Sequence, residues 1–398
     1  MRITPGSTLR HHLSEWALIS AVVLGLAMAG CVPSMPPLPT NPYDEQNQLR
    51  VAILAPLSGE LATYGRTVRR AVELAFDEWN ERRNDSEVFI QPVPEDTPCD
   101  ATDARQVAER VVAMGIRFII GGICSEAAIP IADVADKNGA LFLATSATHP
   151  LVTVDASGNT RPLVFRTAFT YTQQGRAASR FLLQTLRLER VAVVNNLRSP
   201  FAREVVAAFR EAFTSQGGTA SIVSVDASQQ SDLGASLESI ITSDVQAVYV
   251  PDHCATMIHI QEALRAHGSD KALLAGDWWN VHELDLTTLE GVYLTAHYSA
   301  QIADPAALQW AARYRAAFAV EPDALAALAY DAAALLVQGI EQSESASPQA
   351  VAHTLSAIEY KGVTGRWRFN AQHDPLKQAI FLRVRDGALQ FAGSAGVE

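Results

Sequence analysis

From residue 50 onward, the chain alternates short apolar, often β-branched runs with longer segments in which apolar residues recur every three or four positions. The first pair predicts a strand over residues 50–55 and a helix over 63–80, with Val68, Val72 and Phe76 on its apolar face. Strands that alternate with helices in this way are typical of a parallel sheet covered by helices on both faces.

Two series of such pairs follow one another, separated by a less regular stretch over 145–170. Further strands of the first series are predicted over 88–91, 117–120 and 140–144, with helices over 100–114 and 125–137. The second series has predicted strands over 190–195, 219–224, 247–250 and 272–275, with helices over 172–186, 201–216, 233–242 and 256–267. Asp100 and Ser125 are the expected N-caps of the two helices that begin there. Two doubly wound units are the simplest interpretation.

The last hundred residues depart from this alternation. Past Gly291 the pattern turns helical, over 305–318, 322–340 and 348–357, and then gives short strands around Trp367, 380–384 and 389–391. Helices without strands of their own predict that the chain returns to cover the first unit, so that several crossings join two lobes. Lobe one is expected to comprise residues 49–168 and 297–370, and lobe two residues 169–296 and 371–398.

The first thirty residues have the three parts of an export signal. Basic residues come first, an apolar run over 16–29 follows, and small residues precede Cys31. The uncharged apolar segment over 17–29 has 13 residues, whereas a helix that spans a membrane needs about 20, so a retained anchor is the weaker alternative. Residues 1–30 are therefore predicted to be a signal peptide.

The junction from Met28 to Cys31 resembles the bacterial lipobox, although Met28 stands where leucine is usual. This resemblance implies that the thiol of Cys31 carries a lipid and becomes the new N-terminus; ordinary cleavage near Ala29 is the alternative. Five prolines follow before residue 48, which is typical of an extended tether. Residues 31–48 are thus predicted to be a lipidated cysteine and a tether that hold the body near a membrane.

Composition and motifs narrow the classes of function. Hydrophobic residues make up 48% of the chain and charged residues 19%, with a formal net charge of −12, which argues against nucleic acid as a partner. The body lacks the phosphate loop GxxxxGK[ST], HExxH, the GxSxG elbow and paired CxxC motifs. We therefore expect no enzyme activity, no cofactor and no metal site.

Four segments, in order along the chain, carry a resemblance to a known family. They are VAILAPLSGELATYGRTVRRAVELAFDEWN, LFLATSATHP, RPLVFRTAFTYTQQGRAASRFL and RWRFNAQHDPLKQAIFLRVRDGALQ. Together they resemble the leucine/isoleucine/valine-binding family, the type I periplasmic solute-binding proteins of branched-chain amino acid ABC transporters. The resemblance implies the type I periplasmic binding protein fold: α/β, with two doubly wound parallel-sheet lobes joined by several hinge crossings.

The cysteines test this resemblance. With Cys31 committed to lipid, Cys99, Cys124 and Cys254 permit three single pairings, among which spacing cannot choose. The family's best-known members join the turn before the second helix to the turn after the third strand. Cys99 and Cys124 occupy these places, so the resemblance implies that they form a disulfide and that Cys254 stays a free thiol.

An amino acid ligand needs anion donors on one side and an acid on the other. The resemblance assigns the ligand's carboxylate to Ser125 and to the loop of Ser146 and Thr148, where helix N-termini and backbone N–H groups favour negative charge. It assigns the ammonium to Asp277, which two tryptophans follow, the first being Trp278. The alternatives are that Ser125 is only an N-cap, that the loop is an ordinary turn and that Asp277 is a solvated turn residue.

Five further residues complete the candidate site, and one of them is Trp278, directly after Asp277. Tyr64 matches an aromatic residue that lines the family's side-chain pocket, Phe201 falls near a second such position, and Tyr171 is expected to approach the cleft. Core packing is the alternative for Phe201. His253 is a ligand contact, a pH-sensitive group or a core histidine.

The predicted function is that of an extracytoplasmic, lipid-anchored substrate-binding protein of an ABC importer. Its partners would be a small polar solute, a membrane permease and the membrane itself, on the periplasmic side of the cell envelope. The expected solute is a branched-chain or related amino acid, with an amide-like solute as the alternative. The alternative is an envelope lipoprotein that uses the same fold to dock on other proteins and binds no solute.

Overall fold

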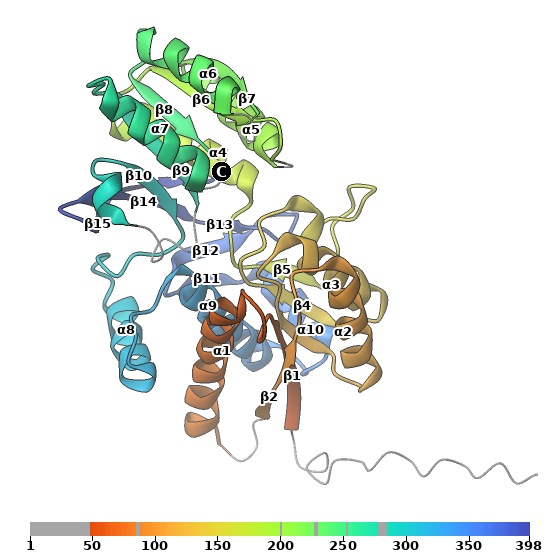
Figure 1. The fold of residues 1–398 in the computed structure, drawn as a ribbon. Helices are drawn as coiled ribbons and strands as arrows, with labels where there is room; N and C mark the ends of the chain where they lie inside the picture. Colours follow the sequence, from red (N-terminus) through yellow and green to blue (C-terminus); the bar gives the residue numbers. More distant parts are fainter. Residues whose placement is uncertain (1–47, 85–87, 200, 227–229, 252–253, 278–284) are drawn as a thin grey trace, which may run out of the picture. The chain divides into compact units, whose positions relative to one another are not determined.

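The computed structural model describes residues 48–84, 88–199, 201–226, 230–251, 254–277 and 285–398 (Figure 1). The predicted signal peptide, Cys31 and the tether lie outside these residues. The described part contains two large sheets, each with helices packed on both faces, and one small three-stranded sheet. The predicted α/β class with parallel-sheet lobes is confirmed.

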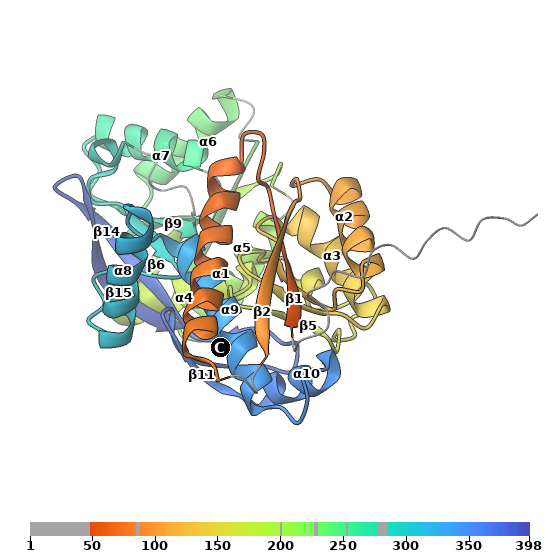
Figure 2. The same cartoon turned by 90° about the horizontal axis from the view of Figure 1, so that it is seen from below.

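The first sheet has five parallel strands in the order β2-β1-β3-β4-β5. Its strands are β1 (Gln48–Ala55), β2 (Phe89–Asp96), β3 (Phe118–Gly121), β4 (Leu141–Ala144) and β5 (Val164–Arg166), and its first helices are α1 (Ala62–Arg82), α2 (Ala101–Ala113) and α3 (Ser125–Lys137). Strand β1 explains why the apolar runs are continuous: Val51 and Ile53 face the core under α1, while Ala52 and Leu54 face the core under α2 and α3. Figure 2 shows α1 on one side of β1, with α2 and α3 on the other.

The second sheet has seven strands in the order β15-β14-β10-β9-β8-β6-β7. The five strands from β10 to β7 are parallel, whereas β14 and β15 add in antiparallel fashion. The bounds are β6 (Arg190–Asn196), β7 (Thr219–Val225), β8 (Ala247–Val250), β9 (Ala272–Asp277), β10 (Tyr293–Ala296), β14 (Gln378–Arg385) and β15 (Ala388–Gly396). Its helices are α4 (Tyr171–Arg180), α5 (Ala202–Ser215), α6 (Gln230–Thr242) and α7 (Cys254–Ala266).

The late helices return to the first unit. These are α8 (Pro305–Phe318), α9 (Ala324–Gln342) and α10 (Pro348–Ala357), and the small antiparallel sheet β11 (Glu359–Gly362), β12 (Gly365–Phe369) and β13 (Pro375–Leu376) follows them. Side chains of α8, α9 and α10 share one core with β1 and α1, and Figure 2 shows α9 beside α1. The assignment of residues to two lobes stays a prediction.

Helix α9 is apolar on almost every side because it is buried. Among the described helices it alone is long and apolar enough to cross a membrane, by length and composition, and 67% of its most apolar window is buried in the core. Asp331, in the middle of α9, has no exposed surface and accepts bonds from Tyr360, Val363 and Thr364. A core helix accounts for this burial.

Several predicted elements need correction. The stretch over 145–170 contains β5 and a short 3-10 helix, Pro150–Val152, and the chain past Gly291 first forms β10. Both strands are short, and Arg166 in β5 and Thr295 in β10 interrupt the continuous apolar run by which the other short strands were predicted. The helix predicted to end at residue 186 does so through a π-helical turn, Phe181–Thr185. Ser125 is not the N-cap of α3, because Cys124 occupies that position in an extended conformation.

Candidate functional site

Two loops of the first sheet come together at the carboxyl ends of β3 and β4. Ser125 is the first residue of α3, and its hydroxyl oxygen accepts a bond of 3.3 Å from the backbone N–H of His149. Ser146 donates a bond of 3.3 Å to the carbonyl oxygen of Ile123. Ser125, Ser146 and Thr148 are all half-buried. Because parallel strands present their carboxyl ends at one edge, these three residues lie at the edge where ligands of open α/β sheets bind.

Glycine brings β3 close to its neighbour at this edge. Gly121 has φ of 149°, and a side chain there would collide with the carbonyl group of Leu54 on β1. Gly122 follows with φ of 71°, where the left-handed region favours glycine. These two residues set the tight turn from β3 into α3.

A disulfide fixes the start of α3. Cys99 and Cys124 are bonded with their Cα atoms 5.6 Å apart, which confirms the pairing that the family resemblance implied. The bond ties the turn before α2 to the N-cap of α3, directly beside Ser125. Cys254 begins α7, and its side chain lies outside the described part.

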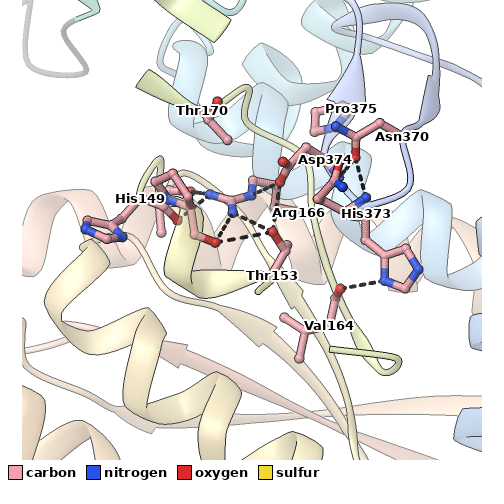
Figure 3. A network of polar contacts seen from close by, with 12 residues as sticks. His149, Thr153, Val164, Arg166, Thr170, Asn370, His373, Asp374 and Pro375 are labelled. Atoms are coloured by element: carbon pink, nitrogen blue, oxygen red, sulfur yellow. Dashed lines mark hydrogen bonds and ion pairs between the residues drawn. The ribbon is translucent and has the colours of Figure 1, made fainter. Parts of the chain in front are cut away.

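A buried arginine, which the sequence analysis missed, holds the second loop (Figure 3). Arg166, the last residue of β5, has no exposed surface and donates bonds of 3.1 and 2.8 Å to the carbonyl oxygens of Ala147 and His149. It donates another, of 3.2 Å, to the carbonyl oxygen of Pro150. One guanidinium group thus fixes the backbone on both sides of Thr148.

The charge of Arg166 has a partner from the far end of the chain. Its Nε lies 2.6 Å from Oδ1 of Asp374, and its Nη2 donates a bond of 2.7 Å to the hydroxyl of Thr153, which in turn donates to Asp374 (Figure 3). Burial lowers the pKa of Arg166, and the Asp374 carboxylate opposes this effect. An arginine inside the apolar run of β5 was the one available sequence signal for this network.

The first turns of α4 and α5 face this loop. Tyr171 is the first residue of α4, its backbone N–H donates to the carbonyl of Thr148, and its ring lies edge-on to His149 with centroids 5.5 Å apart. Its hydroxyl donates a bond of 2.7 Å to Glu204 on α5, while Phe201 lies 6.1 Å from the same ring. Burial raises the pKa of Tyr171, so the phenol remains a donor.

Asp277 lies on the second sheet, and among the described residues its side chain makes no hydrogen bond to Ser125, Ser146 or Thr148. It ends β9, where the pairing with β10 shifts register so that Thr295 lies opposite it, a β-bulge. Its side chain is 13% exposed, so it is not a solvated turn residue. Nε2 of His297 lies 2.8 Å from its Oδ2, and because a carboxylate only accepts, this nitrogen donates.

A buried lysine, Lys377, lies near Asp277. Lys377 donates bonds of 2.9 Å to the carbonyl of Thr167 and 3.1 Å to the hydroxyl of Thr364. Burial lowers its pKa to about 8, against the opposing charges of Asp331 and Asp277. At neutral pH, Lys377 is therefore still mostly an ammonium ion.

The remaining predicted residues contribute less. Tyr64 lies in the first turns of α1 and packs, half-buried, against the first core. Phe201 packs against the core of α4 and α5, which agrees with the core-packing alternative, and it also contacts Tyr171. His253 and Trp278 lie outside the described residues.

Two cavities occur away from these residues. One, of about 420 Å³, is lined by residues of α10 and the chain after β12, and the other, of about 210 Å³, lies between β10 and the start of α9. None of the predicted site residues lines either cavity. Among the described residues, no group of three or more His, Cys, Asp and Glu side chains could hold a metal ion. The candidate site is therefore described by its polar side chains and their contacts, and not by a cavity.

Comparison with known proteins gives the family. The model of a family described as periplasmic binding protein matches residues 48–388, which is most of the chain. A leucine/isoleucine/valine-binding protein of Rhizobium johnstonii is 27% identical over 343 residues, covering 84% of this chain and 90% of that protein. A binding protein for leucine, isoleucine, valine, threonine and alanine from Pseudomonas aeruginosa is 24% identical over 82% of this chain and 87% of its own length.

Among solved structures, the leucine-binding protein of Thermotoga maritima superposes with a TM-score of 0.73 at 25% identity. The match covers 87% of this chain and 98% of that one.

Proposed function

The chain belongs to the periplasmic binding protein family, and from this premise we propose that it is the substrate-binding protein of an ABC importer that takes up a branched-chain or related amino acid. Homologues of this family imply an extracytoplasmic location. Two matched relatives are named for binding leucine, isoleucine and valine, which supports a small apolar amino acid as the ligand. In this role the chain performs no chemistry, and ATP hydrolysis belongs to its partners.

The carboxylate of the ligand would bind at the first sheet. The observation that carries the proposal is the convergence of Ser125, Ser146 and Thr148 at the carboxyl ends of β3 and β4. The hydroxyl groups of these residues, the backbone N–H groups that have no partner within the first turn of α3 and the local dipole of this 13-residue helix all favour an anion.

The ammonium of the ligand would bind Asp277 at the second sheet. A carboxylate that is 13% exposed is a strong acceptor for a charged donor, and such bonds contribute about 1.5–3 kcal/mol. Tyr64, Tyr171 and Phe201 would form the walls around the ligand's side chain. His253 and Trp278 remain predicted contacts. Each half would hold one end of the ligand, so binding both ends favours closure of the two lobes.

We further propose that residues 1–30 are removed, that Cys31 carries a lipid and that residues 31–48 tether the body to a membrane beside its permease. The basis is the sequence pattern before and after Cys31. Mass spectrometry of the mature N-terminus tests this. A diacylglyceryl adduct on Cys31 supports the anchor, and an unmodified N-terminus elsewhere rejects it.

Thermal unfolding against a ligand panel tests the function. The purified chain would be heated with each apolar amino acid, and with amides, urea and aromatic acids. A ligand at 100 times its dissociation constant stabilises by about 2.7 kcal/mol. That raises the midpoint by a few degrees in a protein of this size. Stabilisation by an apolar amino acid is expected; no effect across the panel would favour a lipoprotein that docks on other proteins.

A further inference from the structure

The surroundings of His297 support one further inference, which rests on the proposed function. This residue follows β10 directly, where the chain leaves the second sheet, and its side chain is 3% exposed. Its Nε2 lies 2.8 Å from Oδ2 of Asp277. No role of His297 is evident from the sequence, because the two residues are 20 positions apart and meet only through sheet pairing.

The ring of His297 is fixed by its surroundings. It packs against Phe169 with ring centroids 3.7 Å apart, and Phe169 lies just before α4, where another segment of the chain approaches the second sheet. The bulge that places Thr295 opposite Asp277 sets the direction of the strand leading to His297. The imidazole therefore has little freedom to turn away from the carboxylate.

The other ring nitrogen indicates the protonation state. Nδ1 of His297 is buried and has no hydrogen-bond partner among the described residues. A doubly protonated ring would place an N–H donor there without an acceptor, and burying such a group costs about 1–3 kcal/mol. A neutral ring with its proton on Nε2 satisfies the bond to Asp277 and leaves only a lone pair unused.

We propose that His297 is a positioning residue for Asp277: its Nε2–H holds one carboxylate oxygen and leaves the other for the ammonium group of the ligand. Because the ring is neutral, the pair keeps the full negative charge of the carboxylate. The site therefore selects ligands with an ammonium group over carboxylic acids and amides of the same shape.

The arrangement also makes binding sensitive to acid. The charged groups that face His297 are Asp277 on β9 and Lys377 before β14. Burial lowers the pKa of His297 below its ordinary value of 6.5, with the charge of Asp277 opposing this effect. Protonating the ring would add a second cation beside Lys377 and repel the ligand's ammonium. Affinity for the ligand is therefore expected to fall as the pH drops through the lowered pKa of His297, below 6.5.

Two substitutions separate positioning from packing. His297→Gln keeps an amide N–H near the place of Nε2, whereas His297→Phe keeps the ring and removes the donor. With L-leucine as the probe in calorimetric titrations, His297→Phe should weaken binding about tenfold or more, and His297→Gln by less than about threefold. In an Asp277→Asn background, His297→Phe should have no further effect.

A matched control is His373→Asn. This half-buried histidine stacks on Phe165 with centroids 3.9 Å apart and donates to the carbonyl of Val164, in the first unit. Asparagine suits its backbone, which has φ of 61°. Leucine affinity should not change in this variant.

Nitrogen-15 NMR at pH 7 gives a readout that needs no ligand. Nε2 of His297 should carry the proton and Nδ1 should be unprotonated. The opposite tautomer, a charged ring, equal losses in the Gln and Phe variants, or additive losses in the Asp277→Asn background would overturn the inference. If the wild-type chain binds leucine and His297→Phe binds it equally well, this inference fails and the proposed function stands. If no amino acid binds the wild type, the proposed function fails and takes this role of His297 with it.

Discussion

The two halves of the candidate site are built in different ways. At the first sheet, the polar groups belong to loops that are fixed from several sides, by the disulfide at Cys124 and by Arg166, which binds three backbone carbonyl groups. At the second sheet, the site is one carboxylate, Asp277, and the contact that orients it comes from one imidazole, His297. The first half thus depends on the backbone conformation of its loops, and the second on the orientation of one charged side chain.

This difference has a physical reason. A carboxylate can be held by backbone N–H groups, which any residue supplies, so the half that binds it depends on backbone geometry. An ammonium group needs an acceptor with negative charge, and only an acidic side chain provides one. Substitutions in the first half should therefore act mainly through stability, and substitutions in the second through affinity.

The largest expected effect concerns Arg166. Arg166→Met leaves Asp374 partly buried without its cation and frees three carbonyl groups, so the free energy of unfolding should fall by about 3–5 kcal/mol. Urea unfolding measures this loss. Arg190→Met, which removes an exposed pair with Asp244, is the matched control and should change stability little. An Arg166 variant as stable as the wild type would mean that the network does not hold the loop.

The disulfide should contribute slightly less. Replacing Cys99 and Cys124 by alanine opens a loop of 25 residues, which the chain-entropy model values at about 3.5 kcal/mol. The midpoint of urea unfolding should fall accordingly. A reductant should lower this midpoint for the wild type but not for the double variant. If reductant destabilised both proteins alike, the effect would not belong to this bond.

A smaller effect is expected at Ser125. Ser125→Ala removes the hydroxyl that we propose binds the ligand's carboxylate and that also accepts from His149, so leucine binding should weaken about fivefold, equivalent to about 1 kcal/mol. Calorimetric titration measures the change. Ser215→Ala, which removes an exposed hydroxyl at the end of α5, is the control. Unchanged affinity in Ser125→Ala would leave Ser125 as a loop contact only.

Much of the fold and part of the candidate site could be predicted from the sequence. The alternation of apolar runs predicted most strands and helices, because two-sided burial makes each strand a continuous apolar run. The short strands β5 and β10 were not predicted, because Arg166 and Thr295 interrupt their apolar runs. Ser125 and Asp277 were predicted to bind the ligand through the family resemblance, and their roles stay predictions.

The positioning residues could not be found in the same way. Arg166 and His297 act through partners that are distant in sequence, such as Asp374, which lies 208 positions after Arg166. Such pairs exist only once the sheets are assembled. The one local hint in each case was a polar residue at the end of an apolar strand.

The most direct test of the central claim is a paired titration with L-leucine and with its 2-hydroxy acid, which keeps the carboxylate and lacks the ammonium. The wild-type chain should bind leucine more tightly. Asp277→Asn should weaken leucine binding about tenfold to a hundredfold and leave both the hydroxy acid and the melting temperature of the unliganded protein nearly unchanged. Equal losses for both ligands, or no loss for leucine, would contradict the division of the site into a carboxylate half and an ammonium half.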